Sequence, residues 1–373
     1  MDNRNLELVT ELRHLLHSNP ELSGFETETK KTLIAFLQRH TSLSIVDRGK
    51  WFYAVYKAGD SLPGSYPSLA FRADMDAVAV EENLDLPYKS KNPGVSHKCG
   101  HDGHCATLAG FALEVEQLKP QKNIYFLFQH AEENAGGAIE CVSIFENEKI
   151  DEIFGLHNMP GWPKKSIVLR EGTFMCASEG ITATFTGTST HASTPWKGIN
   201  PAIALAETIL EIKKISEKSL YKSMVLCTII HSSLGTEGAF GVSASKASLS
   251  VTCRAEHDAD IRALKERLYD SARAKAKEHS LTCEFSVHDS FPATVNSKAG
   301  IERVRQAAEK LGLPFIELDD PIGGSEDYGY FLQKTDGAFF FIGAGDHPGV
   351  HSWEYDFPDE LIETGVEMFK ALL

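Results

Sequence analysis

Apolar positions along the first 180 residues change repeatedly between a helical and a strand period. Residues 6–16 and 33–37 repeat every three or four positions, which predicts two helices. Ser23 and Glu26 have the spacing of a capping box, so the second helix is expected to begin there. A further helical pattern covers 103–118, and short β-rich runs cover 51–56, 68–72, 124–129 and 153–157. Strands that alternate with helices predict an α/β fold with a mainly parallel sheet flanked by helices.

The pattern changes after residue 176. Strand-like and helix-like segments then follow in the order β-α-β-β-α-β, which is typical of a ferredoxin-like α+β domain, over 181–187, 201–215, 224–231, 247–253, 261–278 and 281–287. After residue 291 a helix, a strand and a closing helix are expected over 299–311, 338–342 and from 358. We therefore expect a catalytic, metal-binding domain made of 1–176 and 291–373, with 177–290 as an inserted domain.

Composition narrows the classes of partner. The 373 residues include 37 basic and 52 acidic side chains, a formal charge of −15, which argues against nucleic acid or an anionic membrane surface as a partner. The apolar run 338–344 is far too short to cross a bilayer, and the first residues contain no apolar leader segment. The seven cysteines are scattered and odd in number, which favours a reducing compartment. These features predict a cytoplasmic protein.

Four potential metal ligands fall within residues 97–104. His97, Cys99, His101 and His104 supply imidazole and thiolate, the groups that hold Zn²⁺ and its first-row neighbours. A closed structural zinc site would need paired C-x-x-C spacings, and the sequence contains none. The run therefore predicts one wall of an open metal site.

Further candidates follow three of the expected strands. Asp74 and Asp76 come after the strand 68–72, Glu132 and Glu133 after 124–129, and His157 closes 153–157. Ligands of open α/β sheets bind beyond the carboxyl ends of the strands, so we expect these side chains at one edge. Because adjacent residues on an extended or turning backbone point differently, Glu132 and Glu133 are expected to diverge and to have separate roles.

Seven motifs follow one another along the chain: Arg72-Ala-Asp-Met-Asp76, the run 97–104, Phe128-Gln-His-Ala-Glu-Glu133, His157-Asn-Met-Pro160, Thr190-His-Ala-Ser193, Ser325-Glu-Asp-Tyr328 and the late His351. Their order resembles that of the aminoacylase/carboxypeptidase superfamily of metal-dependent amidohydrolases. The chain is most similar to the branch with hippurate hydrolase, N-acetyldiaminopimelate deacetylase and the auxin-conjugate hydrolases. The resemblance covers essentially the whole chain, and it implies a dinuclear-metal exopeptidase-like catalytic domain with an inserted lid or dimerisation domain.

The resemblance also implies a ligand set. The positions that match the family's metal ligands are Cys99, His101, Glu133, His157 and His351. Five protein ligands suggest two divalent ions, with Zn²⁺, Mn²⁺, Co²⁺ and Ni²⁺ all open as the metal. His97, His104, Asp74 and Asp102 lie near these ligands in sequence without an assigned role.

The remaining roles follow from the same resemblance. Glu132 is expected to act as general base, and Asp76 to fix a ligating imidazole through a hydrogen bond. His191 matches a histidine that stabilises the oxyanion, often from the other subunit of a dimer. Arg254 matches a binder of the substrate carboxylate. The expected assembly is a homodimer formed through the inserted domain.

The function implied is hydrolysis of an N-acyl amino acid into a carboxylate and an amino acid. Two alternatives stay open: a dipeptidase or aminopeptidase on the same scaffold, and a non-catalytic descendant that only binds a small molecule. The residues Gly241-Val-Ser-Ala244 replace the family's usual Asn-Val-Ile-Pro, a segment whose Asn commonly holds the substrate. The acyl group and the amino acid are therefore left unspecified.

Overall fold

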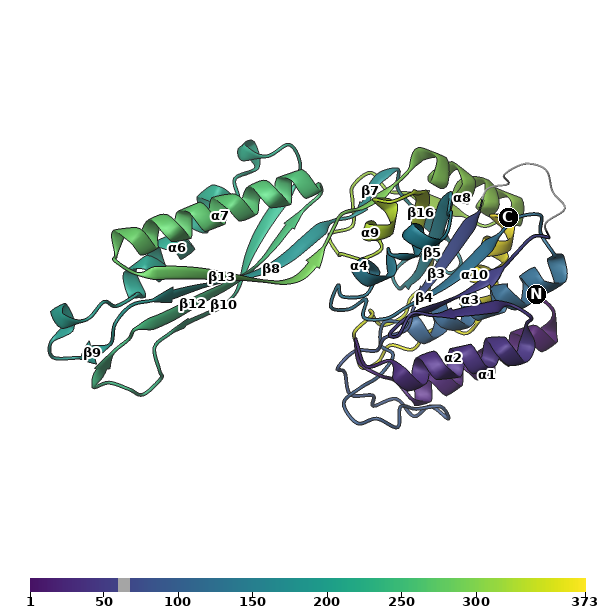
Figure 1. Cartoon of the computed structure of the whole chain (residues 1–373), viewed down its shortest axis with the longest axis horizontal. Helices are drawn as coiled ribbons and strands as arrows, with labels where there is room; N and C mark the ends of the chain where they lie inside the picture. The colour runs from purple at the N-terminus through teal and green to yellow at the C-terminus, as the bar shows by residue number, and fades with distance from the viewer. Residues whose placement is uncertain (60–67) are drawn as a thin grey trace. The chain divides into compact units, whose positions relative to one another are not determined.

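Two units make up the chain in a computed structural model that describes residues 1–59 and 68–373 (Figure 1). The first unit contains Met1–Phe174, Thr294–Pro321 and Glu326–Leu373. The second contains Met175–Ala293 and the short segment Ile322–Ser325, which the sequence-based boundaries placed with the first unit. Among the described residues, none of the helices combines the length and the apolar character needed to cross a membrane.

The first unit is built on one mixed sheet with the strand order β1-β2-β4-β3-β5-β16-β6-β15. The central strands β4, β3, β5 and β16 are parallel to one another. The strands are β1 (Ser44–Asp47), β2 (Phe52–Tyr56), β3 (Leu69–Asp74), β4 (Ile124–Gln129), β5 (Glu152–Met159), β6 (Ile167–Leu169), β15 (Phe315–Glu317) and β16 (Asp336–Gly343). The mainly parallel sheet predicted from the sequence is confirmed.

Alternate residues of the central strands pack against opposite layers. On β16, Phe340 and Ile342 join the large apolar core that also contains α1 (Asn3–Ser18), α2 (Thr27–His40), α3 (His101–Leu118), α8 (Lys298–Leu311) and α10 (Glu360–Ala371). Phe339 and Phe341 instead contact Phe174, and Phe339 also contacts Tyr328. The remaining elements of this unit are α4 (Ala138–Cys141), α5 (Ile144–Asn147), α9 (Gly329–Leu332) and the paired strands β7 (Gly172–Met175) and β14 (Thr294–Asn296).

The predicted capping box of the second helix was wrong. Helix α2 begins at Thr27, and Glu26 occupies the N-cap position without a side-chain cap bond. The Glu26 carboxylate instead accepts hydrogen bonds from the backbone N–H of Ala131, at 2.7 Å, and of Gly24. Both side chains of the expected box are thus engaged in tertiary contacts, because Ser23 also donates to a carboxylate far away in sequence.

The second unit has the predicted β-α-β-β-α-β order. Its four-stranded antiparallel sheet has the order β10-β12-β8-β13, and alternate residues of the central strands form an apolar core with α6 and α7 on one face (Figure 1). The elements are β8 (Ala177–Thr186), α6 (Ala202–Ile215), β10 (Val225–Leu234), β12 (Lys246–Ala255), α7 (Asp258–Glu278) and β13 (Thr282–Phe291), with the short β9 (Thr190–His191), β11 (Val242–Ser243), η1 (Pro195–Lys197) and η2 (Lys218–Leu220).

Candidate metal centre

The five expected metal ligands come from four separate segments of the first unit. Cys99 and His101 flank the N-cap of α3, where Gly100 has a left-handed backbone with φ of 96°. Glu133 lies in the turn after β4, His157 on β5 and His351 in the loop after β16. Because β3, β4, β5 and β16 are parallel, the segments that follow them start at the same edge of the sheet.

Donor atoms of all five residues meet at this edge. The Sγ of Cys99 lies 3.3 Å from the Nε2 of His157, and the Nε2 of His351 lies 3.2 Å from Glu133 Oε1. The donor atoms of Cys99, His101 and His157 lie within 4.8 Å of one another, as do those of Cys99, Glu133 and His351. Cys99 belongs to both groups, so the cluster has the extent expected of two neighbouring cation sites.

His101 gives the clearest indication that the cluster fits a cation. Its ring is fully buried, and Nε2 has no hydrogen-bond partner among the described residues. This nitrogen lies 3.7 Å from carboxylate oxygens of both Asp74 and Glu133. A buried nitrogen without a partner is costly, and a divalent ion held between imidazole and carboxylates would satisfy it.

Asp76 connects two of the candidate ligands. Its Oδ1 lies 3.1 Å from His101 Nδ1, and its Oδ2 accepts from the backbone N–H of Glu133 at 2.9 Å. Ser23 Oγ donates to the same Oδ2 at 2.7 Å. The bond to Nδ1 fixes the imidazole so that Nε2 is the nitrogen that faces the cluster.

The expected divergence of Glu132 and Glu133 was wrong. Carboxylate oxygens of both residues lie within 4.8 Å of each other and of a His101 ring nitrogen. Both residues lie in a tight turn that starts after Ala131, whose φ is 50°. Glutamate side chains have two methylene groups each, so on such a turn they can leave the backbone in different directions and still converge at their carboxylates. Direction at Cα therefore does not separate the roles of the two acids.

Negative charge accumulates around this cluster. Arg72, fully buried at the end of β3, forms ion pairs with Asp74, Glu326 and Asp327. Burial, followed by the charges of Glu326 and Glu133, raises the pKa of Glu132 well above its usual range. A group of acids this dense favours bound cations, which would counteract that rise in pKa.

The neighbouring residues without an assigned role divide into three kinds. His104 has both ring nitrogens hydrogen-bonded, with Nδ1 2.6 Å from Asp74 Oδ1 and Nε2 2.6 Å from Asn158 Oδ1, and its donor atom also lies within 4.8 Å of those of Asp74 and His101. The Asp102 carboxylate accepts a hydrogen bond from Arg13 Nε at 2.9 Å and lies 2.8 Å from His17 Nδ1. His97 is buried and has no hydrogen-bond partner among the described residues, and burial lowers its pKa to about 4.

The two remaining predicted site residues belong to the second unit. His191 is exposed on β9, and its Nδ1 accepts the backbone N–H of Ser193 at 3.1 Å and lies 2.6 Å from the Ser193 hydroxyl. An accepting Nδ1 leaves the proton of the neutral ring on Nε2. Arg254, at the end of β12, donates through Nη1 to Gly323 O and Ser325 Oγ, each at 2.8 Å.

Several residues that shape the cluster were missed in the sequence. Ser23 and Glu26 were assigned to a helix cap. Arg72, Asn158 and Glu326 were part of the quoted motifs, but no role at the site was predicted for them. The signal for Arg72 was available, because a lone arginine in a run of buried strand residues needs charged partners. The partners of Ser23 and Asn158 lie far away in sequence, and no local pattern indicates them.

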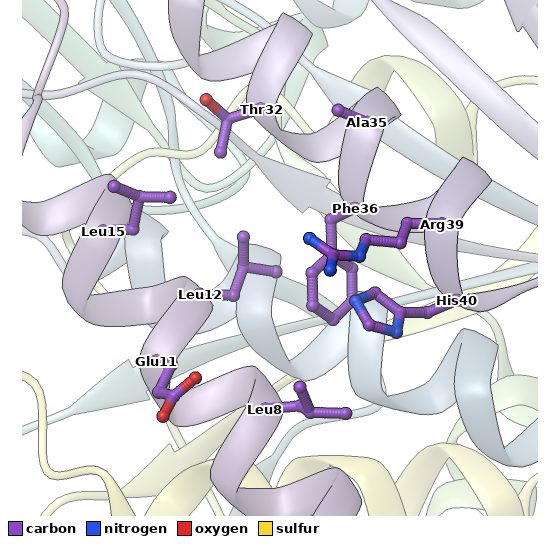
Figure 2. Close-up of a pocket in the computed structure, with 9 residues that line it drawn as sticks. All are labelled: Leu8, Glu11, Leu12, Leu15, Thr32, Ala35, Phe36, Arg39 and His40. Carbon is purple, nitrogen blue, oxygen red and sulfur yellow. The ribbon is translucent and has the colours of Figure 1, made fainter.

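A separate concave surface lies between α1 and α2 (Figure 2). Its lining is mainly apolar, and its ionisable side chains are Glu11, Arg39 and His40. None of the candidate metal ligands contributes to it. The two surfaces differ in chemistry, and the acid-rich edge of the sheet is the one equipped for reaction.

The mainly parallel sheet gathers imidazole, thiol and carboxylate groups at one edge, which is the arrangement of a metal-dependent enzyme. Comparison with known proteins agrees. The profile of peptidase family M20/M25/M40 matches residues 70–373. The chain is 31% identical to N-acetyl-L-cysteine deacetylase of Bacillus subtilis over 91% of the chain and 81% of that protein. It is 28% identical to hippurate hydrolase of Campylobacter jejuni over 97% and 94%.

Solved structures show the same architecture. A dinuclear metal-binding peptidase of the M20 family from Bacillus subtilis superposes with a TM-score of 0.83 at 25% identity, covering 100% of this chain and 98% of the other. The chain therefore belongs to peptidase family M20/M25/M40, and it is a metal-dependent hydrolase of amide bonds. The family and branch predicted from the motifs are confirmed.

Proposed function

We propose that this protein hydrolyses the amide bond of N-acyl amino acids, releasing a carboxylate and a free amino acid. The observation that carries the proposal is the convergence of Cys99, His101, Glu133, His157 and His351, with the bare Nε2 of His101 among them. The names of the relatives, which include hippurate hydrolase and deacetylases of acetylated amino acids, support this substrate class.

In this proposal the five residues hold two divalent ions. Cys99 contributes to both donor groups, which favours a shared site over two independent ones. When bound, such ions supply Lewis acidity and lower the pKa of water toward ~7. The metal itself is left open, because availability often decides among Zn²⁺, Mn²⁺, Co²⁺ and Ni²⁺.

Glu132 is the proposed general base. Its carboxyl group is buried beside the donor cluster, where it can take a proton from the attacking water and pass it to the departing amine nitrogen. The water oxygen forms the new bond to the acyl carbon, and the C–N bond breaks. Burial and then the acidic neighbours raise the pKa of Glu132, and bound cations would oppose that rise and keep the carboxylate able to accept a proton. Asp76 keeps His101 and Glu133 in place during the reaction.

His191 is the proposed donor to the oxyanion. The hydrogen bond from Ser193 N–H to Nδ1 favours the tautomer with a proton on Nε2, which is the form a donor needs. Arg254 is the proposed partner of the substrate carboxylate, since a guanidinium binds two oxygens at once. The residues that hold its Nη1 orient the side chain for that contact.

The proposed assembly is a homodimer formed through the second unit. Edge strand β10, the loop after it and β11 carry exposed apolar side chains, among them Ile230, Leu234, Phe240 and Val242. Apolar side chains exposed along a strand edge are typical of a surface that pairs with another chain. We propose a second copy of this protein as that chain, with the second unit acting as a lid.

The experiment that tests the function is a substrate panel. Metal-stripped protein is reloaded with each of the four ions and incubated with acetyl, benzoyl and succinyl derivatives of several amino acids, alongside unblocked dipeptides. Amine release from the acylated compounds and not from dipeptides supports the proposal. Hydrolysis of dipeptides alone favours the dipeptidase alternative, and loaded protein inactive on every compound favours a binding role.

A further inference from the structure

Lys98, the residue before Cys99, is fully buried although it carries an ammonium group. Its Nζ forms an ion pair with Glu82 and donates a hydrogen bond to the backbone carbonyl of Tyr355 at 2.7 Å. A lysine is seldom buried completely, and it persists only where its charge and its donors are satisfied. The partners of Lys98 therefore indicate what the side chain holds together.

Neutralising Glu82 does not explain the lysine. The Glu82 carboxylate also accepts the backbone N–H of Ser90 at 2.8 Å and lies 3.2 Å from His17 Nε2. Burial opposes the charge on His17, but Asp102 and Glu82 raise its pKa to about 9, so Glu82 has a second cation beside it. Buried ion pairs are also weak contributors to stability by themselves. Glu82 has other partners, so the contact that only Lys98 provides is its hydrogen bond to the Tyr355 carbonyl.

The backbone of Lys98 holds the other end of the same segment. The N–H of His351 donates to Lys98 O at 2.6 Å, while Nζ reaches Tyr355 O. His351 has a φ of 65°, in the left-handed region that residues other than glycine adopt only where their surroundings hold them. One residue therefore fixes both ends of the segment 351–355, directly beside Cys99 in the chain.

The segment is also connected to strand β5, which bears His157. The buried Tyr355 hydroxyl accepts a hydrogen bond from Asn158 Nδ2, and Asn158 follows His157 on β5. Residues adjacent to Cys99 and His157 and the loop of His351 thus form one hydrogen-bonded unit. A shift of Lys98 would change the spacing of these three ligands together.

We propose that Lys98 is a positioning residue of the metal centre, which sets the place of His351 relative to Cys99 through its two contacts with 351–355. This inference rests on the proposed function, because it takes Cys99 and His351 as ligands. Lys98 touches neither substrate nor metal in this role. Its removal should weaken metal binding through the loop and leave the fold of the first unit in place.

The test compares Lys98→Met with Lys370→Met. Methionine keeps an unbranched stem of similar length and removes the ammonium, and with it the contact to Tyr355 O, while the backbone bond from His351 N–H to residue 98 stays. Lys370 lies on α10 of the same unit and forms an ion pair with Glu114 at 2.8 Å. It forms no hydrogen bond or ion pair with the described residues 351–355, so it is the matched control. Zinc affinity is measured by competition with a coloured chelator, and amide exchange of 351–355 is measured on metal-stripped protein.

We expect Lys98→Met to lower zinc affinity by about 10- to 100-fold, the range typical of residues that support ligands, and to speed exchange of the His351 amide before any metal is added. Lys370→Met should change neither quantity. Wild-type protein that binds none of Zn²⁺, Mn²⁺, Co²⁺ and Ni²⁺ overturns the proposed function and this role together. Wild-type protein that binds zinc, with Lys98→Met matching it in affinity and exchange, overturns the role of Lys98 alone.

A second variant covers the case in which the single variant does not fold. Lys98→Met combined with Glu82→Gln removes both charges of the pair and leaves no extra carboxylate buried. It should fold and show the same loss of zinc affinity, since the contact with Tyr355 is absent in it as well. Zinc affinity equal to wild type in this double variant contradicts the positioning role.

Discussion

The carboxylate of Asp76 lies 3.1 Å from His101 Nδ1, on the side of the ring opposite the nitrogen that faces the donor cluster. The same carboxylate accepts the backbone N–H of Glu133. Asp76→Ala should therefore lower metal affinity by about 10- to 100-fold, because Glu133 N–H loses its acceptor and His101 Nδ1 keeps only the Asp76 backbone carbonyl, at 3.0 Å. Asp76→Asn keeps an oxygen acceptor and should lose less. Metal retained against graded chelator concentrations measures both, and equal affinity in Asp76→Ala and wild type would contradict the assignment.

Glu132→Gln should remove turnover while metal content stays near the wild-type value. Glutamine can still form hydrogen bonds, but it cannot accept the proton of water. General-base assistance is typically worth about 10² to 10⁴ in rate, so a fall of at least this size is expected. Elemental analysis alongside amine-release kinetics separates loss of chemistry from loss of metal. Activity above a tenth of wild type would remove Glu132 from the role of base.

Gly100→Ala should destabilise the protein more than Gly161→Ala. Both glycines have a left-handed backbone, with φ of 96° and 88°, so alanine costs about 1–2 kcal/mol at each position. At Gly100 the added Cβ would also lie 2.4 Å from Asn158 Oδ1, whereas nothing lies within 4 Å at Gly161. This overpacking should add about 1–3 kcal/mol. Urea unfolding of the metal-free proteins measures the difference, and equal losses would show that Asn158 moves away freely.

His17 should make stability depend on pH between about 6.5 and 9. Burial opposes its charge, but Asp102 and Glu82 raise its folded pKa to about 9, against ~6.5 when unfolded. The folded protein then binds more protons within this window, so the contribution, on the order of 3 kcal/mol, is complete below pH 6.5 and is lost as pH rises through 9. Unfolding free energies across this range should be flatter for His17→Gln than for wild type. His231→Gln, at an exposed position of the second unit, is the control and should keep the wild-type slope.

His191→Ala should lower kcat with full metal content and a small change in KM, because an oxyanion donor acts mainly in the transition state. Loss of such a donor typically costs ~10² to 10³ in rate. If the donor comes from a partner subunit, mixing His191→Ala with Glu132→Gln chains should restore part of the activity in heterodimers. Steady-state kinetics after demonstrated subunit exchange provides the measurement. A mixture as inactive as its parents would limit His191 to its own chain.

Much of the architecture could be predicted because periodicity and strand-end chemistry are local. The strand 124–129 and the helix 103–118 are visible from a few neighbouring residues, and the observed β4 and α3 follow these limits closely. The ligands cluster as expected because parallel strands deliver their carboxyl ends to one edge. Edge strands such as β1 and β15 were not predicted, because they are short and their residues are not buried throughout.

The contacts that adjust the site could not be predicted in the same way. Ser23 meets Asp76, Lys98 meets Tyr355 and Arg72 meets Glu326, pairs separated by tens to hundreds of residues. A local rule assigned Ser23 to a cap that its tertiary partner overrides. The prediction that Glu132 and Glu133 diverge failed for a related reason. The direction of the Cα–Cβ bond does not determine where the carboxylate of a flexible side chain lies.

The position of β16 has a consequence for the order in which a new chain matures. This strand, residues 336–343, lies between β5 and β6 in the sheet, although more than 150 residues separate it from either. During synthesis, one edge of β5 therefore stays unpaired until β16 has been made. The strands of the second unit, all within 177–291, are made in this interval and can pair among themselves. An apolar strand edge left open for that interval is a target for aggregation and for chaperones. The sheet of the first unit, whose first strands are made earliest, is thus completed after the sheet of the second unit.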